Sequence, residues 1–169
     1  MIRVLGVIPA RYASTRLPGK PLIDLAGKPM IQHVYERAAQ ARLLDQLLVA
    51  TDDRRIYEAV KAFGGQVQMT SPDHPTGTDR IAEVAREVEC QAVVNIQGDE
   101  PLIAPKVIDL ATEALLSDDS VSVSTLRTKI RDEAEAADTN VTKVVVDQEG
   151  FALYFSACAI PCHRAQTGH

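Results

Sequence analysis

Three long cations and two hydroxyls lie close together in residues 9–22, which read PARYASTRLPGKPL. Arg11 and Arg16 offer forked donors that match phosphate oxygens, and Lys20 offers a compact charge that can follow a phosphate as it reacts. Gly19 permits close approach of the backbone to a ligand, while three prolines stiffen the loop before anything binds. This composition predicts an anion site, with a basic surface loop as the plain alternative.

A second polar loop, residues 70–80 (TSPDHPTGTDR), carries hydroxyls that can both donate and accept hydrogen bonds. Thr78 or Asp79 is expected to cap the helix that follows. Arg80 then falls in the first turn, where the helix dipole disfavours a cation. An anionic ligand would explain Arg80, and a solvated arginine is the alternative.

A third motif, Gln97 to Pro101 (QGDEP), comes directly after an apolar run. An aspartate here, opposite a phosphate loop, suits Mg²⁺, which takes one or two carboxylates and fills its octahedron with phosphate oxygens and water. Asp99 is therefore the expected metal ligand. For Glu100 we favour a salt bridge or a turn contact over second-ligand status. Asp52 either caps a helix or holds a ribose, and capping is preferred.

The elements that must position these loops alternate between apolar runs and helical patterns, which is typical of a mainly parallel sheet covered by helices. Strands are predicted at residues 4–8, 46–50, 66–69, 92–96 and 120–126. Helices are predicted at residues 29–42, around 56–63, around 81–88, at 105–117 and, solvated, at 131–138. Within 105–117 the inward residues should be Val107, Leu110, Ala111 and Ala114. Loops after such strands meet at one edge of the sheet, the usual ligand site.

An antiparallel hairpin is predicted near the end of the chain, with residues 141–147 and 151–156 flanking the turn 148–150. Lys143 in its first strand either is solvated or faces a ligand cleft. Cys158, Cys162, His163 and His169 have a spacing that zinc could use, but no second half-site precedes them, so thiols and a loose tail are expected.

Composition limits the classes of function. The 169 residues suit one domain, and no apolar run approaches the roughly 18 residues that would span a bilayer, so no membrane role is expected. The first residues enter a strand without a secretory pattern, which predicts a cytoplasmic protein. A net charge of −5 disfavours nucleic acid and fits a small polyanion.

The motifs PARYASTRLPGKPL, GTDRIAEV, NIQGDEP and KVVVDQEGFALYFS together resemble those of 3-deoxy-manno-octulosonate cytidylyltransferases, also called CMP-KDO synthetases, over nearly the whole chain. The resemblance implies a Rossmann-like α/β nucleotidyltransferase, a three-layer sandwich with a mostly parallel sheet and an antiparallel hairpin near the C-terminus. Residues 1–169 would form a single domain that lacks the C-terminal part of the family fold.

The activity implied by the resemblance is attack of the anomeric hydroxyl of 3-deoxy-D-manno-octulosonate (KDO) on the α-phosphate of CTP, which releases pyrophosphate and activates the sugar for lipopolysaccharide synthesis. Mg²⁺ on Asp99 is the implied cofactor. The residues implied to act in catalysis are Arg11, Arg16, Lys20 and Asp99. Those implied to bind the nucleotide are Ala10, Arg11, Ser14, Lys20, Thr78 and Arg80, with the second loop reading cytosine. Gln97 would contact the sugar.

Two departures from the family pattern affect this interpretation. Ala157 stands where the family has an arginine after LYFS. Relatives also continue beyond the equivalent of His169, with a segment implied to supply sugar contacts, a homodimer interface and a second metal carboxylate. The chain is then expected to be a truncated or frameshifted form that binds CTP with magnesium and turns over weakly or not at all.

Three other interpretations stay open. A cytidylyltransferase for another sugar acid, such as sialic acid, would share the nucleotide-binding residues. A truncated, inactive CTP-binding module that docks on a complete subunit is possible on the same motifs. An unrelated α/β domain with an incidental basic loop is disfavoured, because three motifs recur in the right order at successive strand ends.

Overall fold

Two compact units follow each other along the chain in a computed structural model that describes residues 2–13 and 17–161. The first unit is Met1–Thr125 and the second is Leu126–His169. The expectation of one domain over residues 1–169 stays a prediction. Within the described ranges, no helix has both the length and the apolar character needed to cross a bilayer.

Strand β1 (Ile2–Ala10) runs through the middle of the first unit. Its side chains point alternately to the two faces of the sheet, so Ile8 joins one buried cluster while Leu5 and Val7 join the other. Because helices cover both faces, the strand reads as a continuous apolar run and not as an alternating one. The short elements that follow β1 are the 3-10 helix η1 (Lys20–Leu22) and the antiparallel strands β2 (Asp24–Leu25) and β3 (Lys28–Pro29).

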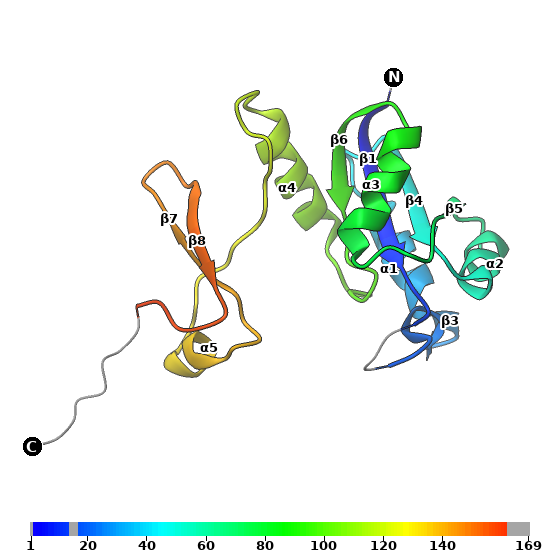
Figure 1. Ribbon diagram of the computed structural model, residues 1–169, viewed down its shortest axis with the longest axis horizontal. Coiled ribbons are helices and arrows are strands. Elements are labelled where there is room, and N and C mark those ends of the chain that lie inside the picture. The colour runs from blue at the N-terminus through cyan, green and yellow to red at the C-terminus, as the bar shows by residue number, and fades with distance from the viewer. Residues whose placement is uncertain (1, 14–16, 162–169) are drawn as a thin grey trace, which may run out of the picture. The chain divides into compact units, whose positions relative to one another are not determined.

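The main sheet is parallel throughout, with the strand order β5-β4-β1-β6 (Figure 1). Its other strands are β4 (Gln46–Thr51), β5 (Val67–Met69) and β6 (Cys90–Asn95). The chain adds β4 and β5 on one side of β1 and then crosses to add β6 on the other side. The order of strands therefore reverses between β1 and β6, where open α/β sheets form their ligand crevice.

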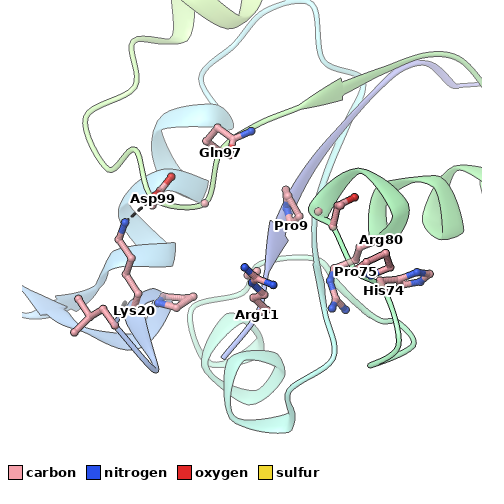
Figure 2. Close-up of a pocket in the computed structure, with 14 residues that line it drawn as sticks. Pro9, Arg11, Lys20, His74, Pro75, Arg80, Gln97 and Asp99 are labelled. Carbon is pink, nitrogen blue, oxygen red and sulfur yellow. Dashed lines mark hydrogen bonds and ion pairs between the residues drawn. The ribbon is translucent and has the colours of Figure 1, made fainter. Parts of the chain in front are cut away.

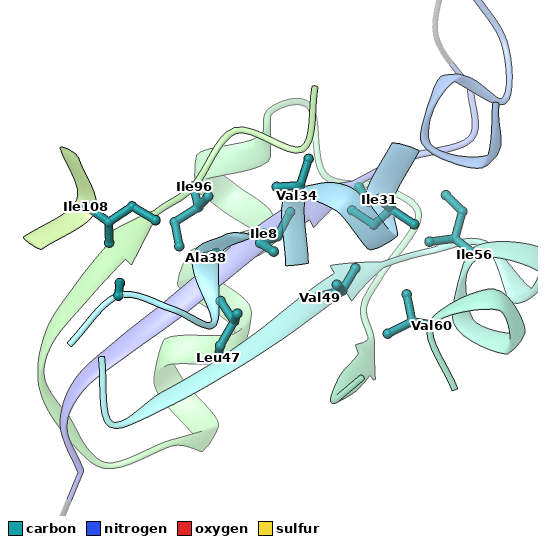
Figure 3. Close-up of a cluster of buried hydrophobic side chains, with 12 residues drawn as sticks. Ile8, Ile31, Val34, Ala38, Leu47, Val49, Ile56, Val60, Ile96 and Ile108 are labelled. Carbon is teal, nitrogen blue, oxygen red and sulfur yellow. The ribbon is translucent and has the colours of Figure 1, made fainter. Parts of the chain in front are cut away.

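Helices cover both faces of this sheet. They are α1 (Met30–Ala38), α2 (Arg54–Ala62), α3 (Gly77–Glu87) and α4 (Pro105–Leu116). Val34 of α1, Val60 of α2 and Ile108 of α4 pack in the cluster on one face (Figure 3). Ile81 and Val84 of α3 pack in the cluster on the other face. The three-layer α/β fold predicted from the sequence is thus confirmed.

The second unit contains a short exposed helix and an antiparallel hairpin. Its elements are α5 (Glu133–Ala137), β7 (Lys143–Val146) and β8 (Ala152–Ser156). Gly150 has a φ of +94° in the connecting turn, a conformation that favours glycine, so the predicted hairpin is confirmed. Lys143 is only 3% exposed, and its ammonium donates to the carbonyls of Asp138, at 2.8 Å, and Ala157. Its charge therefore stabilises the base of the hairpin.

The strand predicted at residues 120–126 is wrong, because residues 117–130 form neither helix nor strand. The alternation of apolar and polar residues there is typical of a strand, yet a strand needs a neighbouring ladder, and none pairs with this segment. The Ser124 hydroxyl instead donates to the carbonyl of Ala111 on α4 at 2.7 Å, and the Val123 side chain is largely exposed.

Candidate active site

A pocket of about 740 Å³ opens at the carboxyl edge of the sheet, where β1 and β6 end. Three segments of the described chain line it. The end of β1 and its loop contribute Pro9, Ala10, Arg11, Leu17, Lys20 and Pro21, the second loop and the first turn of α3 contribute His74, Pro75, Thr76, Gly77 and Arg80, and the turn after β6 contributes Gln97, Gly98 and Asp99. The volume suits a ligand of nucleotide size. The three motifs identified in the sequence therefore meet at one place.

Most of the predicted site residues line this pocket. They are Ala10, Arg11, Lys20, Arg80, Gln97 and Asp99. Thr78 lies in the first turn of α3 but outside the pocket lining. Ser14 and Arg16 lie outside the described residues. The roles of all these residues in binding or catalysis stay predictions.

The pocket has two chemically different ends (Figure 2). At one end the ammonium of Lys20 lies 2.7 Å from the Asp99 carboxylate. His74, Pro75 and Arg80 lie at the other end, with Arg11 between the two groups. One end thus offers paired charges to a phosphate and a cation, while the other offers the His74 ring and loop backbone to a flatter polar group.

Gly98 brings the turn after β6 against the end of β1. A Cβ at this position would lie 2.9 Å from the carbonyl oxygen of Pro9, which is closer than a side chain tolerates. The glycine therefore permits the close approach that places Asp99 and Gln97 beside the loop after β1.

The Arg80 guanidinium is fixed by a network of hydrogen bonds that could not be predicted from the sequence. The side chain is 3% exposed, and its guanidinium donates to the Asp52 carboxylate at 2.8 Å, to the Thr70 hydroxyl and to the Ser71 carbonyl at 3.3 Å. Asp52 thus neither caps a helix nor stands in the pocket lining, and Asp53 is the cap of α2. The alternative of a solvated arginine is wrong, and the unfavourable position of Arg80 in the first turn of the helix was the signal in the sequence that it has another partner.

The second loop is fixed at both of its ends. The Glu83 carboxylate accepts the backbone N–H of Ser71 at 3.0 Å and contacts the ring of His74. The hydrogen bond from His74 and, to a smaller extent, that from Ser71 lower the pKa of Glu83 below its ordinary value of 4.5. Thr76 caps α3 by accepting the N–H of Asp79 at 3.2 Å, so the predicted caps Thr78 and Asp79 are wrong.

A magnesium ion is compatible with the donors present. Asp99 supplies a hard carboxylate at the pocket wall that already attracts one cation, the Lys20 ammonium. Over residues 2–13 and 17–161, no cluster of three or more histidine, cysteine, aspartate or glutamate side chains could hold a metal by itself. A site that combines one protein carboxylate with phosphate oxygens and water fits Mg²⁺. Of the possible zinc residues, Cys162, His163 and His169 lie outside the described chain.

A parallel three-layer fold with a pocket at the reversal of its strand order defines a Rossmann-like α/β protein, a class in which nucleotides are commonly bound at this place. The family model of the cytidylyltransferases matches residues 5–169. The chain belongs to that cytidylyltransferase family.

Individual relatives agree with this assignment. The chain is 55% identical over 163 residues to a 3-deoxy-manno-octulosonate cytidylyltransferase of Geobacter sulfurreducens, with 96% of this chain and 65% of the relative covered. It is also 55% identical to the enzyme of the same name from Syntrophotalea carbinolica, of which it covers 64%. A solved structure of CMP:2-keto-3-deoxy-manno-octonic acid synthetase in complex with CTP matches with a TM-score of 0.92 and 50% identity, covering 96% of this chain and 67% of that one. The chain thus spans slightly less than two thirds of the length of these curated relatives.

Proposed function

We propose that this chain carries the CTP-binding part of an enzyme that transfers CMP from CTP to the anomeric hydroxyl of KDO. The observation that carries the proposal is the pocket that gathers Arg11, Lys20 and Asp99 where β1 and β6 end. A relative 50% identical in sequence has been solved with CTP, which supports CTP as the ligand. The names of the curated relatives support KDO as the acceptor.

In the proposed complex the triphosphate lies at the Lys20 and Asp99 end, and cytosine lies toward His74 and Arg80. The oxygen of the sugar hydroxyl forms a bond to the α-phosphorus and its proton passes to water. The bond from that phosphorus to the oxygen bridging to the β-phosphate breaks, and pyrophosphate leaves with the electron pair. Such transfers depend on in-line positioning and on stabilising negative charge, with little covalent help from the protein.

Arg11 and Lys20 supply that stabilisation from the loop after β1, since both side chains line the pocket. Mg²⁺ held by Asp99 would neutralise charge on the departing pyrophosphate. Gln97 is placed in the pocket lining where a sugar hydroxyl could be oriented. Arg16 is proposed to act in catalysis with Arg11 and Lys20. Ala10, Ser14, Thr78 and Arg80 complete the proposed set of nucleotide contacts. Because CTP is a cytoplasmic metabolite, we place the reaction in the cytoplasm, as a step toward lipopolysaccharide.

Calorimetric titration with CTP tests the binding step. We expect CTP to bind in the presence of Mg²⁺, and Asp99→Asn to abolish the dependence on the metal, because an amide is a far weaker ligand than a carboxylate. Glu100→Gln is the matched control, since this neighbouring carboxylate is absent from the pocket lining. Equal binding of CTP with and without Mg²⁺ in the unmodified chain would refute the proposed site.

Release of pyrophosphate from CTP tests the chemistry and the acceptor. Release with KDO, and not with sialic acid, would support the proposed reaction. Release with sialic acid alone would change the acceptor, and CTP binding without any release would make the chain a nucleotide-binding module. A homodimer, which the resemblance implies for the family, is measured separately by light scattering.

A further inference from the structure

Tyr12 lies at the beginning of the loop that follows β1, and its ring is held on two sides. The guanidinium carbon of Arg55 lies 3.3 Å from the centre of the ring, a short cation–π contact. Gly19 lies against the ring as well, since a Cβ there would stand 3.1 Å from three of the tyrosine side-chain atoms. The N–H of Gly19 also donates to the Tyr12 carbonyl at 2.9 Å, so the backbones of these two residues are joined as well.

Arg55 is itself fixed by Asp53, the cap of α2. The Asp53 carboxylate accepts the backbone N–H of Arg55 at 2.9 Å and two guanidinium N–H groups at 3.0 and 2.6 Å. The Arg55 hydrogen bonds lower the pKa of Asp53, so the carboxylate stays charged at neutral pH. An exposed ion pair contributes little stability by itself, but this one holds the guanidinium plane in one orientation over the ring.

Helix α2 gives this arrangement a rigid base, because Ile56 and Val60 are fully buried in the core beneath it. A continuous set of contacts therefore runs from the core through Asp53 and Arg55 to Tyr12 and Gly19. The residue after Gly19 is Lys20, whose ammonium meets Asp99 in the pocket. None of Tyr12, Asp53 and Arg55 is part of the pocket lining.

We propose that Tyr12, Arg55 and Asp53 are positioning residues that hold Gly19, and with it the adjoining Lys20, where the Lys20 ammonium is presented to the triphosphate. This inference rests on the proposed function, since it assumes that the pocket binds CTP. A loop ordered before binding loses less conformational entropy when the ligand arrives, so the effect should fall on binding of the phosphates. Binding of the base, at the other end of the pocket, should be unaffected.

Arg55→Ala tests the proposal in the full chain, with Arg54→Ala as the matched control. Arg54 is the preceding residue on α2, forms an ion pair with Glu58 at 2.6 Å and lies over the ring of Tyr57, but the loop plays no part in these contacts. We expect Arg55→Ala to weaken CTP binding about two- to fivefold, the size of a cation–π contact at an exposed site, while cytidine binds as before. Arg55→Lys should not restore CTP affinity, because lysine lacks the planar fork.

Hydrogen exchange in the absence of nucleotide gives a second readout. The Gly19 amide, which is hydrogen-bonded to Tyr12, should exchange faster in Arg55→Ala and at the original rate in Arg54→Ala. A purely stabilising role would lower the melting temperature without changing the ratio of CTP to cytidine affinity, and would overturn the proposal. Unchanged Gly19 exchange in Arg55→Ala would overturn it too. If the unmodified chain binds no CTP, the proposed function fails, while the exchange rates still decide whether Arg55 orders the loop.

Discussion

Lys20 and Asp99 neutralise each other in the pocket, with their charged atoms 2.7 Å apart. Both side chains are partly exposed, so water screens the attraction and the pair contributes little to stability. Its importance is chemical, because a divalent cation attracts the carboxylate more strongly than one ammonium does. In the proposed complex, the metal would bind Asp99 and a phosphate would bind Lys20, so that two ionic contacts would replace one.

The Glu83 carboxylate makes the stability of the second loop dependent on pH. Its pKa in the folded chain is below the ordinary value of 4.5, because His74 and the backbone of Ser71 donate to it. Its stabilising contribution is complete above pH 4.5 and is lost as the pH falls through the lower, folded value. We expect the free energy of unfolding to fall over that range, and Glu83→Gln to flatten the fall.

Urea unfolding at pH values on both sides of 4.5 measures this effect. Glu58→Gln is a suitable comparison, since Glu58 pairs with Arg54 on the surface of α2 and makes no contact with the second loop. Equal pH dependence in the Glu83 variant and the unmodified chain would contradict the assignment.

Helices are joined to one another by buried polar contacts as well as by apolar packing. Asp109 on α4 is 9% exposed and accepts the backbone N–H groups of Arg42 and Leu43, at 2.8 and 3.0 Å, in the turn after α1. We expect Asp109→Ala to reduce the free energy of unfolding by about 1–3 kcal/mol, because it leaves these donors without an acceptor.

Chemical denaturation measures the Asp109 effect. Asp109→Asn keeps one acceptor oxygen and should cost less than the alanine variant. Glu113→Ala, on the exposed side of the same helix, should change stability little. A loss in Asp109→Ala no larger than that in Glu113→Ala would show that the contact does not stabilise the fold.

The sequence predicted elements better than it predicted which side of them is buried. Apolar runs identified the four parallel strands, because a strand covered on both faces contains little else. In α4, however, Val107 and Leu110 are exposed, and the buried positions include Asp109 and Thr112. The spacing of apolar residues favoured Val107 and Leu110 as the buried positions. It could not show that the Asp109 carboxylate accepts backbone N–H groups from residues far away in the sequence.

Local signals also explain which parts of the candidate site could be predicted. The composition of residues 9–22 and of the QGDEP motif indicates a binding role for each, and the sheet topology brings the two segments together. The pairing of Asp52 with Arg80, and the stack of Arg55 on Tyr12, join residues far apart in the sequence. The spacing of apolar residues along the sequence does not predict such long-range contacts, so they became visible only in the structure.

At the scale of the whole molecule, every residue that lines the pocket lies between Pro9 and Asp99, inside the unit Met1–Thr125. We expect a fragment of residues 1–125 to fold and to bind CTP with the affinity of the full chain, because compact units with their own core can fold alone. Circular dichroism followed by calorimetric titration tests both parts. A folded fragment with weakened CTP affinity would show that residues 126–169 contribute to binding.

The stack of Arg55 on Tyr12 also gives the protein an internal optical probe. The chain has four tyrosines and no tryptophan, so its near-ultraviolet signal comes largely from phenol rings. One of those rings lies beneath a guanidinium at the beginning of the loop that leads to Lys20. Inorganic triphosphate does not absorb in this range. A change in tyrosine emission when it is added would therefore report a change in the surroundings of the Tyr12 ring, without a label.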